Sequence, residues 1–336
     1  MKKFGVAAAM VILCAVSAMA SNFRAADQVY VPAAGKVGNF ATDVFISNVN
    51  AFPVTVSVIY STGVTGTQTN FNNLFTLAAN ERKEFVDFVG TPQPNGLGLS
   101  GALGMLVFNG CKQGADCGTA TQDPNTGISP NFADISVESR IYATGAIAGF
   151  PTGTTGQLFS GLPWYNFVSQ DQQNNGLDTV FITGIRTTGS GAGTFRTNIG
   201  VVNASQFSNT TLVVKLFKGD GTKVGSDKLI PLQPLGTIQQ NVTDMFPGAS
   251  GSNLYVTVSQ QNSTATSDAP ASCGSTGCAG FFAYGSVLDN TTTDATTLES
   301  QYTKSLTSAQ IACIYPSPDQ PATCKSVAKM RRAVRH

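Results

Sequence analysis

Two stretches of the sequence share one pattern: Phe40–Asn48, which reads FATDVFISN, and Phe195–Asn203, which reads FRTNIGVVN. Each begins with Phe, has Thr two positions later and Asp or Asn directly after the Thr, and ends in Asn. Between these polar residues, branched apolar side chains occupy alternate positions, which is typical of a strand buried on one face. A strand pattern that recurs in the second half of a chain predicts an internal repeat.

The features that follow these stretches also recur in the same order. Four further pairs of segments match: Val54–Tyr60 with Leu212–Phe217, Leu77–Asn80 with Leu232–Leu235, Phe85–Phe88 with Val242–Phe246, and Leu103–Phe108 with Leu254–Val258. Clusters of Gly, Asn, Pro and Thr separate the apolar runs, as in antiparallel sandwiches. Only two segments are predicted to be helical, with one turn each: Phe85–Val89 and Val242–Phe246. We therefore expect an all-β protein with two tandem antiparallel, Ig-like β-sandwich domains.

The expected organisation has four parts: a signal peptide over residues 1–20, a first repeat over 21–175, a second repeat over 176–304, and a Cys-paired basic tail over 305–336. The boundary between the repeats is placed in Ser169–Gly176, which is polar and rich in turn-forming residues. The basic end of the tail is either a solvated chain end or a contact for an anionic surface such as lipid headgroups or acidic glycan.

The N-terminus has the three parts of a secretory signal peptide. Lys2 and Lys3 are followed by the uncharged apolar run Gly5–Val16, and then by small residues at both ends of Ala18–Ala20. The apolar run is shorter than a membrane-spanning helix, which disfavours the alternative of a permanent anchor. We expect export through the Sec pathway to the periplasm, the outer surface or the extracellular space, with no transmembrane anchor after cleavage before Ser21.

Six of the seven cysteines fall into close pairs: Cys111 with Cys117, Cys273 with Cys278, and Cys313 with Cys324. Close pairs in an exported chain predict disulfides. The first two pairs are expected in the connection between the last two strands of each repeat. A metal site is the alternative, but zinc sites favour tighter spacing and histidine ligands, and the only histidine is His336. Cys14 follows Leu13 rather than a small residue, so we expect no lipid anchor there.

The composition excludes several classes of function. The chain has 20 Lys and Arg residues and 19 Asp and Glu residues, and only 12% of its residues are charged. A neutral chain of this kind is not expected to bind nucleic acid. The sequence also lacks the Gly-rich loop with Lys that holds phosphates. Asp123–Gly127 is more typical of a turn than of a calcium loop, because it lacks a further acidic ligand. We expect no cofactor and no metal.

The sequence contains no recognisable catalytic set. A catalytic nucleophile needs a general base beside it, and the only histidine, the C-terminal His336, is poorly placed for that role. Asp43 and Asp87 are among the few acids available, but they belong to no glycosidase motif. Asp43 corresponds to Asn198 in the second repeat, and this exchange preserves a hydrogen-bond acceptor while removing an acid. We therefore expect a non-enzymatic protein.

The most aromatic stretch, Leu162–Phe167, contains the only Trp of the chain. Its rings Trp164, Tyr165 and Phe167 either pack between the two domains or form a platform on which a ligand stacks. The sequence alone leaves both interpretations open.

The repeat resembles a group of exported bacterial proteins built from tandem Ig-like sandwich domains. The resemblance covers roughly residues 29–300 and depends on Val31-Pro32, the Phe-x-Thr-(Asp/Asn) strand, Ser139–Tyr142 and Gly156-Gln157. The second repeat departs from this pattern in its ending, Tyr284–Asn290. The resemblance implies a fold and an exported location, and it carries no established activity or binding residues.

Three functional hypotheses follow. The first is a structural or adhesive module of the cell envelope or extracellular matrix, which contacts envelope proteins or other copies of itself through sheet edges or loops. The second is a glycan-binding module that uses Trp164, Tyr165 and Phe167. The third is a degenerate hydrolase, which the missing catalytic residues disfavour.

Overall fold

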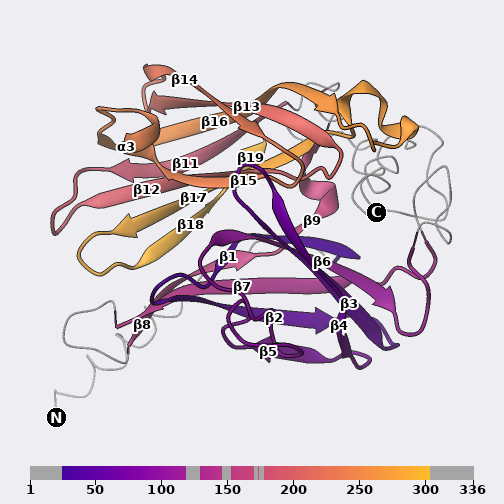
Figure 1. Cartoon of the computed structure of the whole chain (residues 1–336). Coiled ribbons are helices and arrows are strands. Elements are labelled where there is room, and N and C mark those ends of the chain that lie inside the picture. The colour runs from indigo at the N-terminus through magenta and orange to yellow at the C-terminus, as the bar shows by residue number, and fades with distance from the viewer. Residues whose placement is uncertain (1–24, 119–128, 146–152, 170–172, 174–177, 303–336) are drawn as a thin grey trace, which may run out of the picture.

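The structure is a computed structural model that describes residues 25–118, 129–145, 153–169, 173 and 178–302, and the regular secondary structure of these residues is almost entirely antiparallel β-strand (Figure 1). This confirms the expected all-β, sandwich-like class. The predicted signal peptide, Asp123–Gly127, most of the segment 169–176 and the tail 305–336 with Cys313 and Cys324 lie outside the described residues. No helix in the described part of the chain is long and apolar enough to cross a membrane.

The first half of the chain forms two sheets. Sheet I has the strand order β5-β2-β7-β8, and sheet II has the order β4-β3-β6-β1-β9. Their strands are β1 (Gln28–Gly35), β2 (Phe40–Asn48), β3 (Val54–Thr62), β4 (Thr67–Leu77), β5 (Arg82–Phe85), β6 (Leu103–Lys112), β7 (Ile135–Thr144), β8 (Thr154–Ser160) and β9 (Leu162–Pro163). One short 3-10 helix, η3 (Trp164–Asn166), follows β9.

The second half forms two more sheets. Sheet III has the order β10-β17-β12-β15 with β18 beside β17, and sheet IV has the order β14-β13-β16-β11-β19. Their strands are β10 (Val168–Ser169), β11 (Thr179–Thr187), β12 (Phe195–Asn203), β13 (Ser208–Lys218), β14 (Lys223–Leu232), β15 (Thr237–Asn241), β16 (Gly251–Ala265), β17 (Gly280–Asp289), β18 (Ala295–Glu299) and β19 (Gln301–Tyr302). Two short helices are α3 (Val242–Met245) and η4 (Ala271–Thr276). The order of β11 to β19 in sheets III and IV repeats that of β1 to β9 in sheets I and II.

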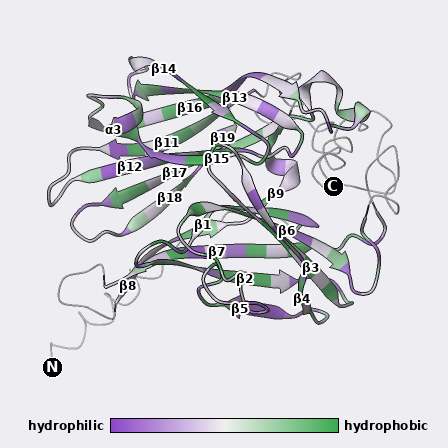
Figure 2. Cartoon of the chain, viewed as in Figure 1, coloured by the Kyte–Doolittle hydropathy of each residue, from purple (hydrophilic) through white to green (hydrophobic). Residues whose placement is uncertain are grey.

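The two motif stretches are the strands β2 and β12, which lie beside β7 and β17 in their sheets. Val44 and Ile46 of β2 are fully buried, as are Ile199 and Val201 of β12. Hydrophobic and hydrophilic segments alternate along the strands (Figure 2). The period of two in the sequence therefore correctly identified these strands.

Of the two helical turns that the sequence predicts, only the second is present. Val242–Met245 forms α3, and the Asn241 side chain accepts a hydrogen bond from the Thr243 backbone N–H at its start. The prediction of a helical turn at Phe85–Val89 is wrong: β5 ends at Phe85, and a non-helical turn follows. Asp87 in this turn has a φ of 48°, which lies outside the right-handed helical region.

The four sheets are stacked in the order I, II, III, IV (Figure 1). One apolar core lies between sheets I and II, and another between sheets III and IV. Sheet II also packs against sheet III. The Tyr30 hydroxyl donates to the Ala204 carbonyl at 3.1 Å, and the Ser61 hydroxyl donates to the Leu235 carbonyl at 2.9 Å. Parts of the surfaces of sheets II and III that face each other are therefore interior.

A loop of the first half also fits against a loop of the second half. The Gln233 N–H donates to the Val64 carbonyl, and the Thr237 N–H donates to the Gly63 carbonyl, each at 2.9 Å. Gly66 has a φ of 58°, and a Cβ atom there would lie 1.9 Å from the Pro234 carbonyl oxygen. Glycine at position 66 is thus required both by the backbone conformation and by the close approach of the second loop.

Candidate functional site

The threonines of the repeated motif connect the two sheets of each sandwich. The Thr42 hydroxyl accepts from the Gly35 N–H at 2.8 Å and donates to the Gly35 carbonyl at 3.0 Å. The Thr197 hydroxyl makes the same two contacts with Arg186, at 3.1 Å and 2.6 Å. Each threonine thus links the second strand of its half to the end of the first strand. The motif is explained by folding rather than by chemistry on a ligand.

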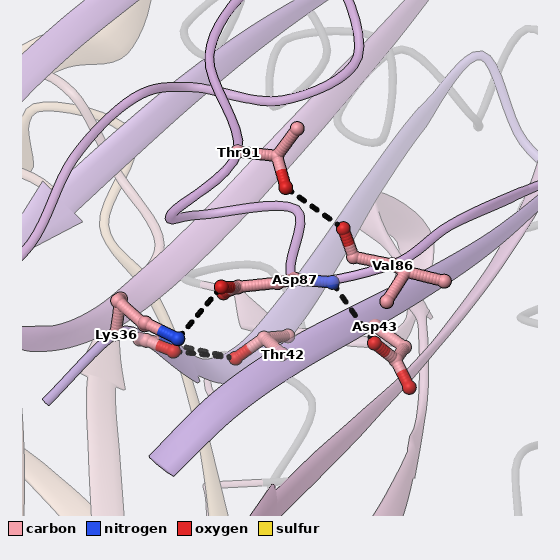
Figure 3. Close-up of polar contacts among 7 residues, drawn as sticks. Lys36, Thr42, Asp43, Val86, Asp87 and Thr91 are labelled. Atoms are coloured by element: carbon pink, nitrogen blue, oxygen red, sulfur yellow. Dashed lines mark hydrogen bonds and ion pairs between the residues drawn. The ribbon is translucent and has the colours of Figure 1, made fainter. Parts of the chain in front are cut away.

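Two acids that are distant in sequence meet at the turn after β5 (Figure 3). The Asp87 N–H donates to Asp43 Oδ1 at 3.0 Å, and Lys36 Nζ lies 2.7 Å from Asp87 Oδ2. Among the described residues, Asp87 Oδ1 is buried and has no hydrogen-bond partner. The Thr91 hydroxyl donates to the Val86 carbonyl at 3.0 Å and helps to close the same turn. The sequence had no motif that predicts this pairing.

Arg140 and Tyr142 extend this cluster across sheet I. Arg140 Nη1 lies 4.0 Å from Asp43 Oδ2, and its guanidinium lies 4.9 Å from the centre of the Tyr142 ring. Burial, followed by the charge of Asp43 and a hydrogen bond to it, raises the pKa of Tyr142. These contacts stabilise the turn and orient β7 against β2. Among the described residues, no group of three His, Cys, Asp or Glu side chains is placed to hold a metal ion.

Two of the three predicted disulfides are present in the described residues. Cys111–Cys117 has a Cα–Cα distance of 6.1 Å, and Cys273–Cys278 has one of 4.5 Å, both in the usual range for disulfides. The first bond joins Cys111 at the end of β6 to the connection that leads to β7, and the second lies in the connection from β16 to β17. The expectation that these connections join the last two strands of each half is wrong, because β8 and β9, and likewise β18 and β19, follow.

The predicted aromatic platform is not a surface feature. Trp164, Tyr165 and Phe167 are 2%, 7% and 1% exposed. Trp164 Nε1 donates to Asp27 Oδ1 at 2.9 Å, and the Phe167 ring stacks on Phe282 of sheet III at a centroid distance of 5.4 Å. The interpretation as a ligand platform is therefore wrong. Packing is the observed role, because the segment passes from sheet II to sheet III at this point.

An open sheet edge is one feature through which this chain can contact a partner. Within the described residues, β4 pairs only with β3, so its other edge has no neighbouring strand. Thr67–Phe71 pairs regularly with β3, and the register then shifts around Asn73, which has a φ of 50°. None of the 11 residues of β4 is charged. An uncharged open edge is able to accept another strand.

A polar groove of about 820 Å³ lies along the solvent side of β3, β4 and β6. Five neutral amide side chains of the first half line it together with one from the second half: Gln68, Asn70, Asn72, Asn73, Asn109 and Gln206. Amides both donate and accept hydrogen bonds, and Asp116 and Asp268 also line the groove, so this surface suits a polar partner. The sequence signal for this groove is the run of amide side chains at the start of β4, which has no spacing typical of a binding motif.

A second cavity, of about 510 Å³, lies where sheet III meets the end of the first sandwich. Residues of both halves line it, including Phe40 of β2 and Arg196 of β12. It falls within the roughly 300–1,000 Å³ range of small-molecule sites, which favour such junctions. The sequence does not reveal this cavity, because its walls are formed by residues of both halves of the chain that lie far apart in sequence.

Comparison with known proteins leaves the family of this chain open. No family model matches the sequence, and no curated protein matches it. Among solved structures, the chain is similar to the β-glucuronidase of Bacteroides uniformis at 10% identity, with a TM-score of 0.16. The match covers 78% of this chain and 24% of the enzyme, so the chain corresponds to about a quarter of that protein's length. A likeness this weak says nothing about activity.

Proposed function

We propose that this chain is an exported, non-enzymatic structural or adhesive protein of the cell envelope or extracellular matrix. We further propose that it consists of two copies of one Ig-like sandwich domain, and that it contacts a second copy of itself through the open edge of β4. The edge is the observation that carries this proposal.

The duplication is supported by topology and by side-chain detail. The strand order β4-β3-β6-β1-β9 of sheet II recurs as β14-β13-β16-β11-β19 in sheet IV. Thr42 and Thr197 make the same pair of bonds in their respective halves. A similar pattern of bonds at the same topological position is what duplication of one domain produces.

Export is supported by the two disulfides together with the signal-like N-terminus. Disulfides persist in oxidising compartments and are rare in the cytosol.

A structural role is supported by the contacts of the two acids at the turn after β5. Asp43 and Asp87 are engaged in bonds that hold this turn, and Lys36 pairs with Asp87.

The comparison between β4 and its counterpart β14 supports strand addition at β4. Both lie at the edge of their sheets. The edge β14 carries Lys223 and Asp227, which form an ion pair, together with Lys228 and Pro231. Charges and proline are the usual protection of an edge against pairing with other chains, and β4 has neither. The same strand from two chains can pair antiparallel about a two-fold axis, which closes the assembly as a dimer.

Sedimentation velocity of the full chain over a range of concentrations tests this proposal. We expect the wild type to form a dimer, and we expect Asn70→Lys to shift it to monomer, since the two-fold axis brings like charges together across the new strand pair. Asn70 is exposed, so this variant should fold normally. The matched control is Ser226→Lys on the exposed edge β14, which should leave the dimer intact. A wild type that stays monomeric at every concentration, or an Asn70→Lys dimer as stable as the wild type, would reject the proposal.

A further inference from the structure

The cavity between sheet III and the end of the first sandwich has two walls of different chemistry. One wall comes from the first half of the chain and is mainly apolar. Val37, Phe40 and Leu103 lie on it, and they are 39%, 49% and 42% exposed. Large apolar side chains with this much exposure that gather in one concave place mark a binding surface more often than a chance arrangement.

The opposite wall is the face of sheet III that carries Arg196 and Asn198 of β12 and Gln239 of β15. Arg196 and Asn198 are two residues apart on one strand, so their side chains share a face of the sheet. Ser286 of β17 lies opposite Asn198 and belongs to the same wall. This wall therefore offers several hydrogen-bonding groups, and Arg196 is the one ionised side chain among the residues that line the cavity.

Arg196 retains unused hydrogen-bonding capacity. Its Nη1 donates to the neutral side chain of Asn290. Within the described residues, no carboxylate lies at ion-pair distance from its guanidinium. A guanidinium has five N–H donors in a planar fork that fits a carboxylate with two parallel bonds. The Asn198 amide beside it makes no side-chain hydrogen bond in the described part of the chain.

We propose that this cavity binds an amphipathic monoanion, namely a carboxylate that carries an aliphatic chain. The carboxylate lies on Arg196 and Asn198, and the aliphatic chain lies on Val37, Phe40 and Leu103. This assignment follows from the single positive charge on one wall and the exposed apolar side chains on the other. Burial of the chain supplies most of the affinity, and the guanidinium supplies the preference for an anion.

Isothermal titration calorimetry of the full chain with three eight-carbon probes tests the proposal. The probes are octanoate, octan-1-ol and octyltrimethylammonium, each below the concentration at which it forms micelles. We expect octanoate to bind with one site per chain, about tenfold more tightly than octan-1-ol, and we expect no binding of the cation. Failure of octanoate to bind, or equal binding of octanoate and octan-1-ol, would overturn the proposal.

Two variants test the contributions of the two walls of the cavity separately. Arg196→Gln should weaken octanoate binding about tenfold and leave octan-1-ol unchanged, and Leu103→Asp should weaken both ligands at least tenfold. The matched controls are Arg82→Gln, at an exposed Arg of β5, and Leu229→Asp, at an exposed Leu of β14. Both controls should bind octanoate like the wild type. Octanoate binding that survives Arg196→Gln and Leu103→Asp unchanged would place the ligand elsewhere and refute the assignment. Since all four substituted residues are partly or fully exposed at the surface, circular dichroism should show every variant folded.

Discussion

Asn48 and Asn203 end the strands β2 and β12 and make the same three-way connection with their side chains. Asn48 Nδ2 donates to the carbonyls of Phe52 and Ala78, both at 2.8 Å. Asn203 Nδ2 donates to the carbonyls of Ser208 and Gln233, at 2.6 and 2.9 Å. In each half, the Oδ1 atom also accepts from the backbone N–H two residues later. One buried amide thus joins the loop after its own strand to the loop before the fifth strand.

Replacement of either asparagine by alanine should be strongly destabilising. Asn203→Ala and Asn48→Ala each remove the donor to two carbonyls that are buried or partly buried, and we expect the free energy of unfolding to fall by about 1–3 kcal/mol. Urea denaturation followed by circular dichroism measures this loss. The control Asn209→Ala changes an exposed residue of β13 and should stay within about 0.5 kcal/mol of the wild type. A loss at Asn203 no larger than at Asn209 would contradict the proposed role.

Trp164 reports directly on the buried aromatic cluster, because it is the only Trp of the chain. Its emission in the folded protein should be shifted to the blue relative to the unfolded chain and protected from acrylamide quenching, since the ring is 2% exposed. Trp164→Ala should lower stability by about 3–5 kcal/mol through the cavity it leaves. A red-shifted, freely quenched emission in the native protein would mean that the ring faces solvent.

The sequence predicted best those features that local periodicity determines. The alternation in Phe40–Asn48 and Ile135–Tyr142 identified β2 and β7, because a half-buried strand requires every second side chain to be apolar. The two disulfides in the described residues were also predictable, since short separations between cysteines in a chain that is expected to be exported leave few partners. The prediction of a helical turn at Phe85–Val89 was wrong, because β5 ends at Phe85 and the Asp87 N–H bonds to Asp43 while Asp87 has a positive φ.

The sequence could not predict how the two halves pack, and the candidate sites depend on that packing. Aromatic residues such as Trp164 and Phe167 suit either a ligand platform or a buried core. Only the position of sheet III decides between these two roles. The same is true of Phe40 and Arg196, which lie far apart in sequence and face each other across one cavity. Tertiary contacts of this kind leave no period or spacing in the sequence.

Tyr60 should make stability depend on pH in the alkaline range. Its side chain is 5% exposed, its hydroxyl donates to the Ala102 carbonyl at 2.9 Å, and burial raises its pKa to about 12. In the unfolded chain the phenol loses its proton near pH 10, so the stability that neutral Tyr60 contributes is complete below pH 10 and is lost as the pH rises toward 12.

We therefore expect the free energy of unfolding to fall between pH 10 and pH 12 more steeply in the wild type than in Tyr60→Phe, by at most about 1.4 kcal/mol for each pH unit. Urea denaturation at closely spaced pH values measures the two slopes. Parallel curves for the wild type and Tyr60→Phe would show that Tyr60 ionises equally in both states.

The Cys273–Cys278 disulfide joins two residues that are five positions apart in the sequence, just before β17. Because the loop that it closes is so short, its contribution to the free energy of unfolding is limited. A chain-entropy account predicts that Cys273→Ser with Cys278→Ser lowers the free energy of unfolding by about 2 kcal/mol. Cys111→Ser with Cys117→Ser should have a similar effect, since its loop is almost equally short. Because the bonds lie in separate connections, the two losses should add in the fourfold variant. A fourfold variant as stable as the wild type would show that neither bond constrains the unfolded chain.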